Sequence, residues 1–556
     1  MIKFSKCKNS ARLIAALSAF SLLVACGEYD DYSMDYPPYA YQKQSAGAMT
    51  CSASAAQSLS MSANASASAS APSTYGINYV PGYGLDEDFN TEEYSALGEN
   101  VFKDVATSPL STFSADVDTA SYANVRRLLN EGVYPLSLPE GSIRVEEMVN
   151  YFSYNYSEPS GESPFGICAE ISDCPWNTSN KLLRLGIKTE DIDYSESADS
   201  NIVLLIDVSG SMNAPNKLPM VVDSFAMMLD NLTDKDRVSI VTYANGVNVL
   251  LIGEKGSHKD EILKVLQSLD PHGGTCGEGG IEAAYELAEK NFIKGGNNRI
   301  IIASDGDFNI GKSSESELSE LIQDKASKGI FLTVLGYGDC NYSDVVMETL
   351  ADDGNGNYAY IDSLKEAEKV LVDEFGANMV TVAKDVKFQA EFNPVYVSEY
   401  RLIGYENRAL NNEDFDNDKK DAGEIGAGHS VTILYEIVPA DPDSSAERTL
   451  KYQTSSPTDA AVDSDEWLTL CVRYKEPNGI RSKKLEYTIG SNCVNDTPSE
   501  DFLFAASVAE YAMILRRSEF VGDGSIKHIC ETLSNLNLND EYKQEFSDIV
   551  NNTYIP

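Results

Sequence analysis

Residues 201–212 read Asn-Ile-Val-Leu-Leu-Ile-Asp-Val-Ser-Gly-Ser-Met, an unbroken apolar run followed by one carboxylate and two hydroxyls. The apolar part has the length and composition of a strand that is buried on both faces. Asp207, Ser209 and Ser211 then occupy alternate positions, and Gly210 lets the chain turn tightly between them. Because hard cations such as Mg²⁺ prefer oxygen ligands, the stretch predicts a divalent-cation site at the end of a buried strand.

Two later segments carry the same kind of chemistry. Gly273-Gly274-Thr275 places another hydroxyl on a glycine-rich loop, and residues 299–304 form a second apolar run that ends at Asp305. The carboxyl ends of parallel strands lie at one edge of a sheet, where ligands of such folds bind. We therefore expect the three segments to meet at a single ion.

In this order, the three segments resemble the metal-ion-dependent adhesion site of the von Willebrand factor type A (VWA) domain. The resemblance covers about residues 198–380. It implies a divalent cation, most favourably Mg²⁺ with Mn²⁺ or Ca²⁺ as alternatives, and an open coordination position for an Asp or Glu of a protein partner. The ligands implied are Asp207, Ser209, Ser211, Thr275 and Asp305. The alternative is that these residues only cap a helix and form turns.

The pattern around the motif predicts an α/β fold, with a doubly wound, mostly parallel, Rossmann-like sheet. Apolar strand-like runs alternate with amphipathic stretches. The expected helices include 218–232 and 262–269, where apolar residues recur at helical spacing. The expected strands are 201–206, 238–244, 247–252, 299–304, 330–336 and 357–361.

Residues 306–313 fit the phosphate-binding pattern G-x-x-x-x-G-K-[ST]. Asp305 and Asp307 would place negative charge where phosphates need amides and a lysine. We therefore expect no nucleotide at this loop.

The N-terminus has the features of a secretory signal. Four basic residues precede an apolar stretch at 13–24, which is too short for an ordinary spanning helix. Leu23-Val24-Ala25-Cys26 resembles the lipobox of bacterial lipoproteins, which implies a membrane anchor on Cys26 in the bacterial cell envelope. Whether the chain faces the periplasm or the cell surface stays open, and an uncleaved anchor helix is the alternative.

We expect six parts along the chain, because composition and pattern change at their boundaries. Residues 108–113 with 118–122, and residues 400–408 with 421–429, resemble the flanks of bacterial envelope proteins with a central VWA domain. Strands before 198 and after 381 are expected to pair into one β-sandwich-like domain with the VWA domain inserted between them; two separate flanking domains are the alternative. The parts are a signal peptide (1–25), a Ser/Ala-rich tether (26–92), an N-terminal flank (93–197), the VWA domain (198–380), a β-rich region (381–498) and C-terminal helices (499–556).

In the flanks, strands are expected at 165–172, 182–188, 383–394, 399–405, 429–438, 449–453, 466–474 and 483–489, and helices at 501–517 and 525–550. An oxidising compartment permits disulfides. Cys276 and Cys340 are expected to bridge beside the metal face, with Cys471–Cys493 and Cys168–Cys174 as weaker pairings and free thiols as the alternative.

The charge balance of 43 basic and 86 acidic residues makes nucleic acid an unfavourable partner. Metalloprotease and nucleophile-elbow motifs are missing from the sequence, so we expect a binding protein and no enzyme. A metal-dependent hydrolase and a purely structural lipoprotein are the alternatives. Residues 414–418 lack the glycine and glutamate of a calcium loop and are expected to form a polar turn.

Overall fold

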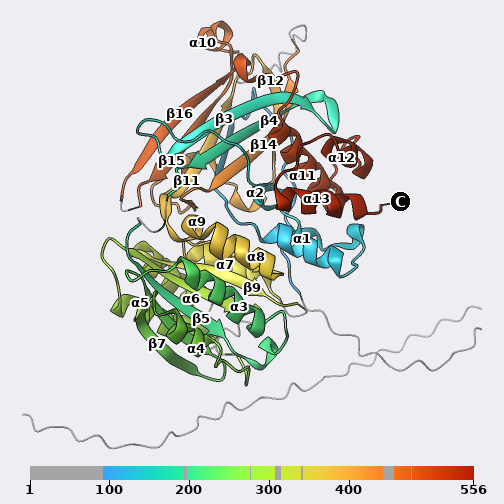
Figure 1. Cartoon of the computed structure of the whole chain (residues 1–556). Helices are drawn as coiled ribbons and strands as arrows, with labels where there is room; N and C mark the ends of the chain where they lie inside the picture. The colour runs from blue at the N-terminus through green and yellow to red at the C-terminus, as the bar shows by residue number, and fades with distance from the viewer. Residues whose placement is uncertain are drawn as a thin grey trace, which may run out of the picture. The chain divides into compact units, whose positions relative to one another are not determined.

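In a computed structural model of the chain, the apolar run at 201–206 forms the central strand of a six-stranded sheet (Figure 1). The structure describes residues 92–555 except 193, 195–196, 276, 307–314, 340–341, 442–455 and 478. The order is β10-β9-β8-β5-β6-β7, and every pairing is parallel except β6–β7. The strands are β5 (Ser200–Asp207), β6 (Arg237–Tyr243), β7 (Val247–Lys255), β8 (Asn297–Ser304), β9 (Ile330–Tyr337) and β10 (Tyr358–Ile361), which confirms the six expected positions.

Both faces of this sheet are covered, as its unbroken apolar strands require. Along β5, Ile202, Leu204 and Ile206 pack into one core, whereas Val203 and Leu205 pack into the other. Each core receives its own set of helices, so the predicted α/β class is confirmed. One face carries α3 (Leu218–Met228), α4 (Lys259–Leu266), α8 (Leu364–Glu368) and α9 (Phe375–Met379); the other carries α5 (Gly277–Lys290), α6 (Glu315–Ser327) and α7 (Asp344–Asp353).

The flanking segments pair with each other across the inserted domain. One five-stranded sheet has the order β1-β12-β14-β4-β3, and the other contains β13-β11-β15-β16 with β2 paired to β11. Residues 181–188 run antiparallel to 430–437, so strands from before and after the VWA domain are neighbours. The expected insertion into a β-sandwich is confirmed. The strands are β1 (Lys103–Asp104), β2 (Leu110–Ser114), β3 (Phe165–Cys174), β4 (Asn177–Thr189), β11 (Thr381–Phe392), β12 (Val397–Ile403), β13 (Gly423–Gly426), β14 (Ser430–Pro439), β15 (Glu466–Lys475) and β16 (Ser482–Gly490).

Helices from both ends of the described chain share a third core with the sandwich. They are α1 (Ala120–Asn130), α2 (Val145–Asn150), α11 (Glu500–Arg516), α12 (Ile526–Leu533) and α13 (Glu541–Asn552). The single helix expected at 525–550 is wrong, because the chain leaves the helix after Leu533 and Asp540 caps a new one through the amides of Tyr542 and Lys543. Among the described residues, no helix combines the length and apolarity needed to cross a bilayer.

Two of the expected cysteine pairings are wrong. Cys168 and Cys174 are free thiols six residues apart on β3, which separates them by about 20 Å in an extended strand. Cys471 and Cys493 are also free, because Cys471 lies opposite Glu486 in mid-strand whereas Cys493 follows the end of β16. The expected strand at 449–453 and Cys26, Cys51, Cys276 and Cys340 lie outside the described residues.

The expected polar turn at 414–418 is confirmed, and the ammonium group of Lys387 lies inside it. Asn411 and Asp414 cap its short helix at Asn412–Asp416 reciprocally. The Lys387 ammonium donates to the carbonyl oxygens of Asp414 and Asn417 at 3.2 and 2.7 Å. A side-chain ammonium therefore occupies the inside of the turn.

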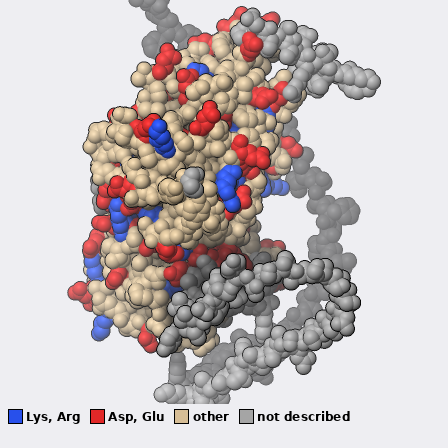
Figure 2. Space-filling model, turned by 90° about the vertical axis from the view of Figure 1, so that its right-hand side faces the viewer, with Lys and Arg blue, Asp and Glu red and all other residues tan. Residues whose placement is uncertain are grey.

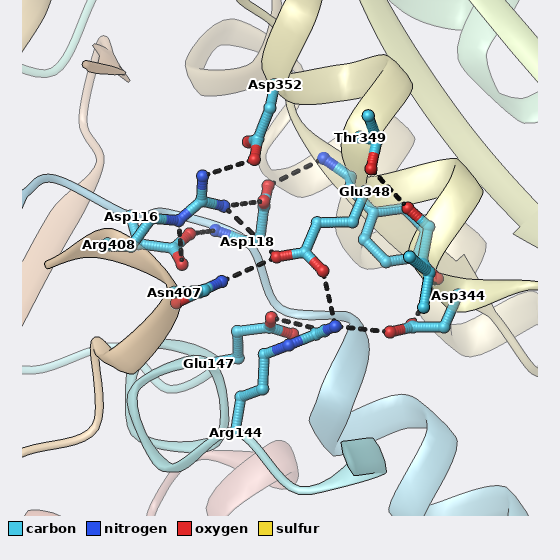
Figure 3. A network of polar contacts seen from close by, with 12 residues as sticks. Asp116, Asp118, Arg144, Glu147, Asp344, Glu348, Thr349, Asp352, Asn407 and Arg408 are labelled. Carbon is cyan, nitrogen blue, oxygen red and sulfur yellow. Dashed lines mark hydrogen bonds and ion pairs between the residues drawn. The ribbon is translucent and has the colours of Figure 1, made fainter. Parts of the chain in front are cut away.

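A buried network of ion pairs joins the VWA domain to the sandwich (Figure 3). Arg144 contacts Glu147 at 2.9 Å and reaches across to Asp344 at 2.6 Å and Glu348 at 2.5 Å, both on α7. Burial raises the pKa of Glu348 to about 8, although Arg144 opposes that rise. The Arg144 guanidinium therefore stabilises the charged form of these buried carboxylates.

Arg408 is the second arginine that connects the VWA domain to the flanking segments. Its guanidinium contacts Asp116 at 2.9 Å and Asp118 at 3.1 Å on the N-terminal side, and Asp352 of α7 at 2.6 Å. Three stretches of chain that are far apart in sequence therefore meet around two arginines (Figure 3).

Replacing Arg144 by Met should lower the free energy of unfolding by about 3–5 kcal/mol, because the variant leaves buried carboxylates without a counter-charge. Lys259→Met is the matched control: its ion pair with Asp230 is exposed, and its loss should cost less than about 1 kcal/mol. Urea titration followed by the fluorescence of Trp176 and Trp467 measures both. Equal losses in the two variants would contradict the role of Arg144.

Candidate metal site

The predicted site lies where the strand order of the sheet reverses. Asp207 ends β5, and Asp305 directly follows β8, the neighbouring strand. The chain runs from β5 outward in both directions, to β6 on one side and to β8 on the other. In open α/β sheets, this is the edge at which ligands bind.

The turn after β5 holds its oxygens close together. The Ser209 amide donates to Asp207 Oδ1 at 2.8 Å, and the Ser209 and Ser211 hydroxyl oxygens lie 2.9 Å apart. Neighbouring ligands of an octahedral Mg²⁺ at 2.0–2.1 Å are separated by about 3 Å, so this pair of oxygens fits such an ion. Within the described ranges, no three His, Cys, Asp or Glu side chains are placed to hold one ion, so a metal here depends on the hydroxyls.

The loop that carries Thr275 is bonded directly to this turn. The Gly210 amide donates to the Gly273 carbonyl at 3.0 Å. Asn245, which follows β6, accepts from the Gly274 amide at 2.7 Å. Gly273 has φ +81°, a conformation that favours glycine, and a Cβ there would lie 2.2 Å from the Asn245 amide nitrogen and force this side chain to move. Asn245 therefore positions the Thr275 loop.

Both aspartates are buried, and the charge of Asp305 affects the ionisation of Asp207. Burial raises the pKa of Asp207 to about 6, and the nearby Asp305 adds to the rise, while hydrogen bonds from Ser209 oppose it. The Ser304 hydroxyl donates to Asp207 Oδ2 at 3.1 Å. Asp305 forms an ion pair with Lys217, in which the distance from Nζ to Oδ2 is 2.9 Å.

The first described residues touch the loop that leads from β9 to α7. The Glu93 amide donates to the Tyr342 carbonyl at 3.0 Å, and the Asp344 amide donates to the Glu93 carbonyl at 3.1 Å. This loop also abuts the metal edge, since a Cβ on Gly306 would lie 2.7 Å from the Ser343 nitrogen. The start of the described chain is thus bonded to a neighbour of Asp305.

The structure gathers Asp207, Ser209, Ser211 and Asp305 at one edge and bonds the Thr275 loop to them; their role as ligands stays a prediction. Sequence reasoning missed Ser304, Asn245 and Lys217. Ser304 and Asn245 lie at strand ends, a signal that would have found them, whereas a lysine beside a metal ligand has no such signal. Most of the 306–313 loop lies outside the described residues.

Comparison with known proteins shows the family to which the chain belongs. The uncharacterized protein YfbK of Escherichia coli (strain K12) is 42% identical over 446 residues, which is 79% of this chain and 76% of that protein. The chain belongs to the YfbK family. The family model described as the YfbK C-terminal region matches residues 377–554, from α9 through the second half of the sandwich to the C-terminal helices.

The central part of this YfbK relative is a VWA domain. The model of the von Willebrand factor type A domain matches residues 202–307, and one described as von Willebrand factor matches 88–184. Human inter-alpha-trypsin inhibitor heavy chain H2 is 26% identical over 173 residues, 30% of this chain and 18% of that one. A solved von Willebrand factor type A structure from Catenulispora acidiphila aligns with a TM-score of 0.37 at 13% identity, covering 70% of this chain and 93% of that one.

Asn245→Ala should weaken Mg²⁺ binding about fivefold, because one hydrogen bond that orders the Thr275 loop is lost. Asn248→Ala, three residues further along at β7, should leave the affinity unchanged, and Asp207→Asn should abolish binding. Isothermal titration of Mg²⁺ into the purified chain checks all three. An unchanged affinity in Asn245→Ala would contradict a role of the Thr275 loop in Mg²⁺ binding.

Proposed function

We propose that this chain is a lipid-anchored protein of the bacterial cell envelope that binds a protein partner through a divalent cation, most favourably Mg²⁺. The ion is held by Asp207, Ser209, Ser211, Thr275 and Asp305, and a partner's Asp or Glu completes its coordination. The observation that carries the proposal is the pair of serine oxygens 2.9 Å apart beside the buried Asp207. Family membership supports a VWA domain around them.

The charge balance of the site favours capture of a carboxylate. Two aspartates face the ion, and the remaining ligands are neutral hydroxyls, while Lys217 already neutralises part of the negative charge. An ion in such surroundings stays electrophilic and attracts an anionic oxygen from outside. The partner's carboxylate therefore supplies charge that the site itself lacks.

We infer a binding role for the ion and no catalytic one. Activation of water would need a general base within reach. His272, on the loop that leads to Thr275, is exposed and its Nδ1 lies 2.7 Å from the Asp270 carbonyl oxygen. His258 and His528 contact Glu254 and Glu510, away from the site.

The surface supports a protein partner over a nucleic acid. On the face in Figure 2, acidic side chains are spread widely and basic ones are isolated. A phosphate backbone is bound by clustered lysines and arginines, and this face has no such cluster among its described residues.

Crosslinking capture from intact cells tests the proposal. The wild type with Mg²⁺ should recover a partner that is lost in Asp207→Ala and on addition of a chelator, because both remove the ion. Asp223→Ala, an exposed aspartate of α3, is the matched control and should behave as the wild type. Recovery of the same partner in all samples would show that binding does not depend on the metal ion and would contradict the proposal.

The anchor is tested separately. Cys26→Ser should abolish labelling by radioactive palmitate and release the chain from the membrane fraction, because the acyl chains hold it there. Cys51→Ser is the control and should keep both. A Cys26→Ser variant that remains labelled and sedimentable would contradict lipidation at this position.

A further inference from the structure

Lys217 lies inside the metal edge, where a second positive charge is unexpected. Its Nζ donates to Asp305 Oδ2 at 2.9 Å, and the side chains are only 7% and 0% exposed. The residue stands just before α3, ten positions after Asp207 on the same loop. An ammonium therefore occupies one oxygen of a carboxylate that the metal site needs.

The lysine stem packs against Gly338, in the loop after β9. Gly338 has φ +80°, and a Cβ there would lie 2.3 Å from Lys217 Cε and 2.6 Å from Cγ. The preceding residue is bonded to the same loop, since Asn216 donates to Asp339 at 3.3 Å. Lys217 is thus guided to Asp305 by its surroundings, and a surface lysine would not be held in this way.

A divalent ion and an ammonium oppose each other at this carboxylate. Both are cations, both seek the oxygens of Asp305, and in a buried site their repulsion is weakly screened. An ion that enters must either displace the ammonium or share the carboxylate with it, and each of these lowers its affinity.

We propose that Lys217 competes with the divalent ion for Asp305, which keeps the metal affinity of the protein low when no partner is bound. This inference rests on the metal site of the proposed function. A partner's carboxylate adds negative charge that stabilises the ion at Asp305 against the ammonium. Metal and partner therefore raise each other's affinity. Lys217 affects metal binding only through its ion pair with Asp305.

Titration with Mn²⁺, followed by the electron paramagnetic resonance signal of the free ion, tests this on the purified full chain. Lys217→Met should bind Mn²⁺ at least about tenfold more tightly than the wild type, because the competing charge is gone. Lys217→Arg, which retains the charge, should bind as weakly as the wild type. Lys290→Met, an exposed lysine of α5, is the matched control and should not differ from the wild type.

Lys217→Gln keeps the proposal testable if the methionine variant does not fold, because it removes the charge and retains an N–H donor for Asp305. Equal or weaker binding in the neutral variants, with loss in Asp207→Ala, would overturn the competition and leave the metal site intact. Absence of Mn²⁺ binding in every folded variant would overturn both the competition and the proposed function.

Discussion

The buried guanidinium groups of Arg144 and Arg408 are the contacts on which the junction depends. Besides the two chain connections between the VWA domain and the sandwich, these two arginines tie two further stretches directly to α7, one at Arg144 and one at Arg408. Removing several charges from water is costly, and the cost is offset only if every partner is in place. The junction is therefore selective: it tolerates one arrangement of α7 against residues 116–147.

The same helix connects this junction to the metal edge. The loop between β9 and α7 contacts the stem of Lys217 at Gly338 and lies against Gly306, and α7 begins at the Arg144 partner Asp344. A shift of Lys217 would thus meet a loop whose far end is fixed by a buried ion pair. Interiors that are close-packed respond to such shifts by changing between discrete arrangements.

Local patterns were sufficient for the VWA sheet and for the placement of its candidate ligands. An unbroken apolar run predicts a buried parallel strand, and Asp207 and Asp305 directly follow two such runs. The register of 181–188 against 430–437 leaves no local trace, because the partners lie about 250 residues apart. The break at 534–540 was missed because helical spacing continues on both sides of it. Lys217 was missed because its partner becomes visible only when β8 is placed beside β5.

The bridge at Glu93 gains a different meaning if the chain carries tension. Glu93 lies at the start of the described residues, downstream of the proposed anchor, and its main-chain bonds are to Tyr342 and Asp344. A pull at Glu93 would therefore load the β9–α7 loop directly, through these two main-chain hydrogen bonds. The loop lies between the metal edge and the buried arginines, so tension at Glu93 would be passed to the segment that borders the candidate metal site.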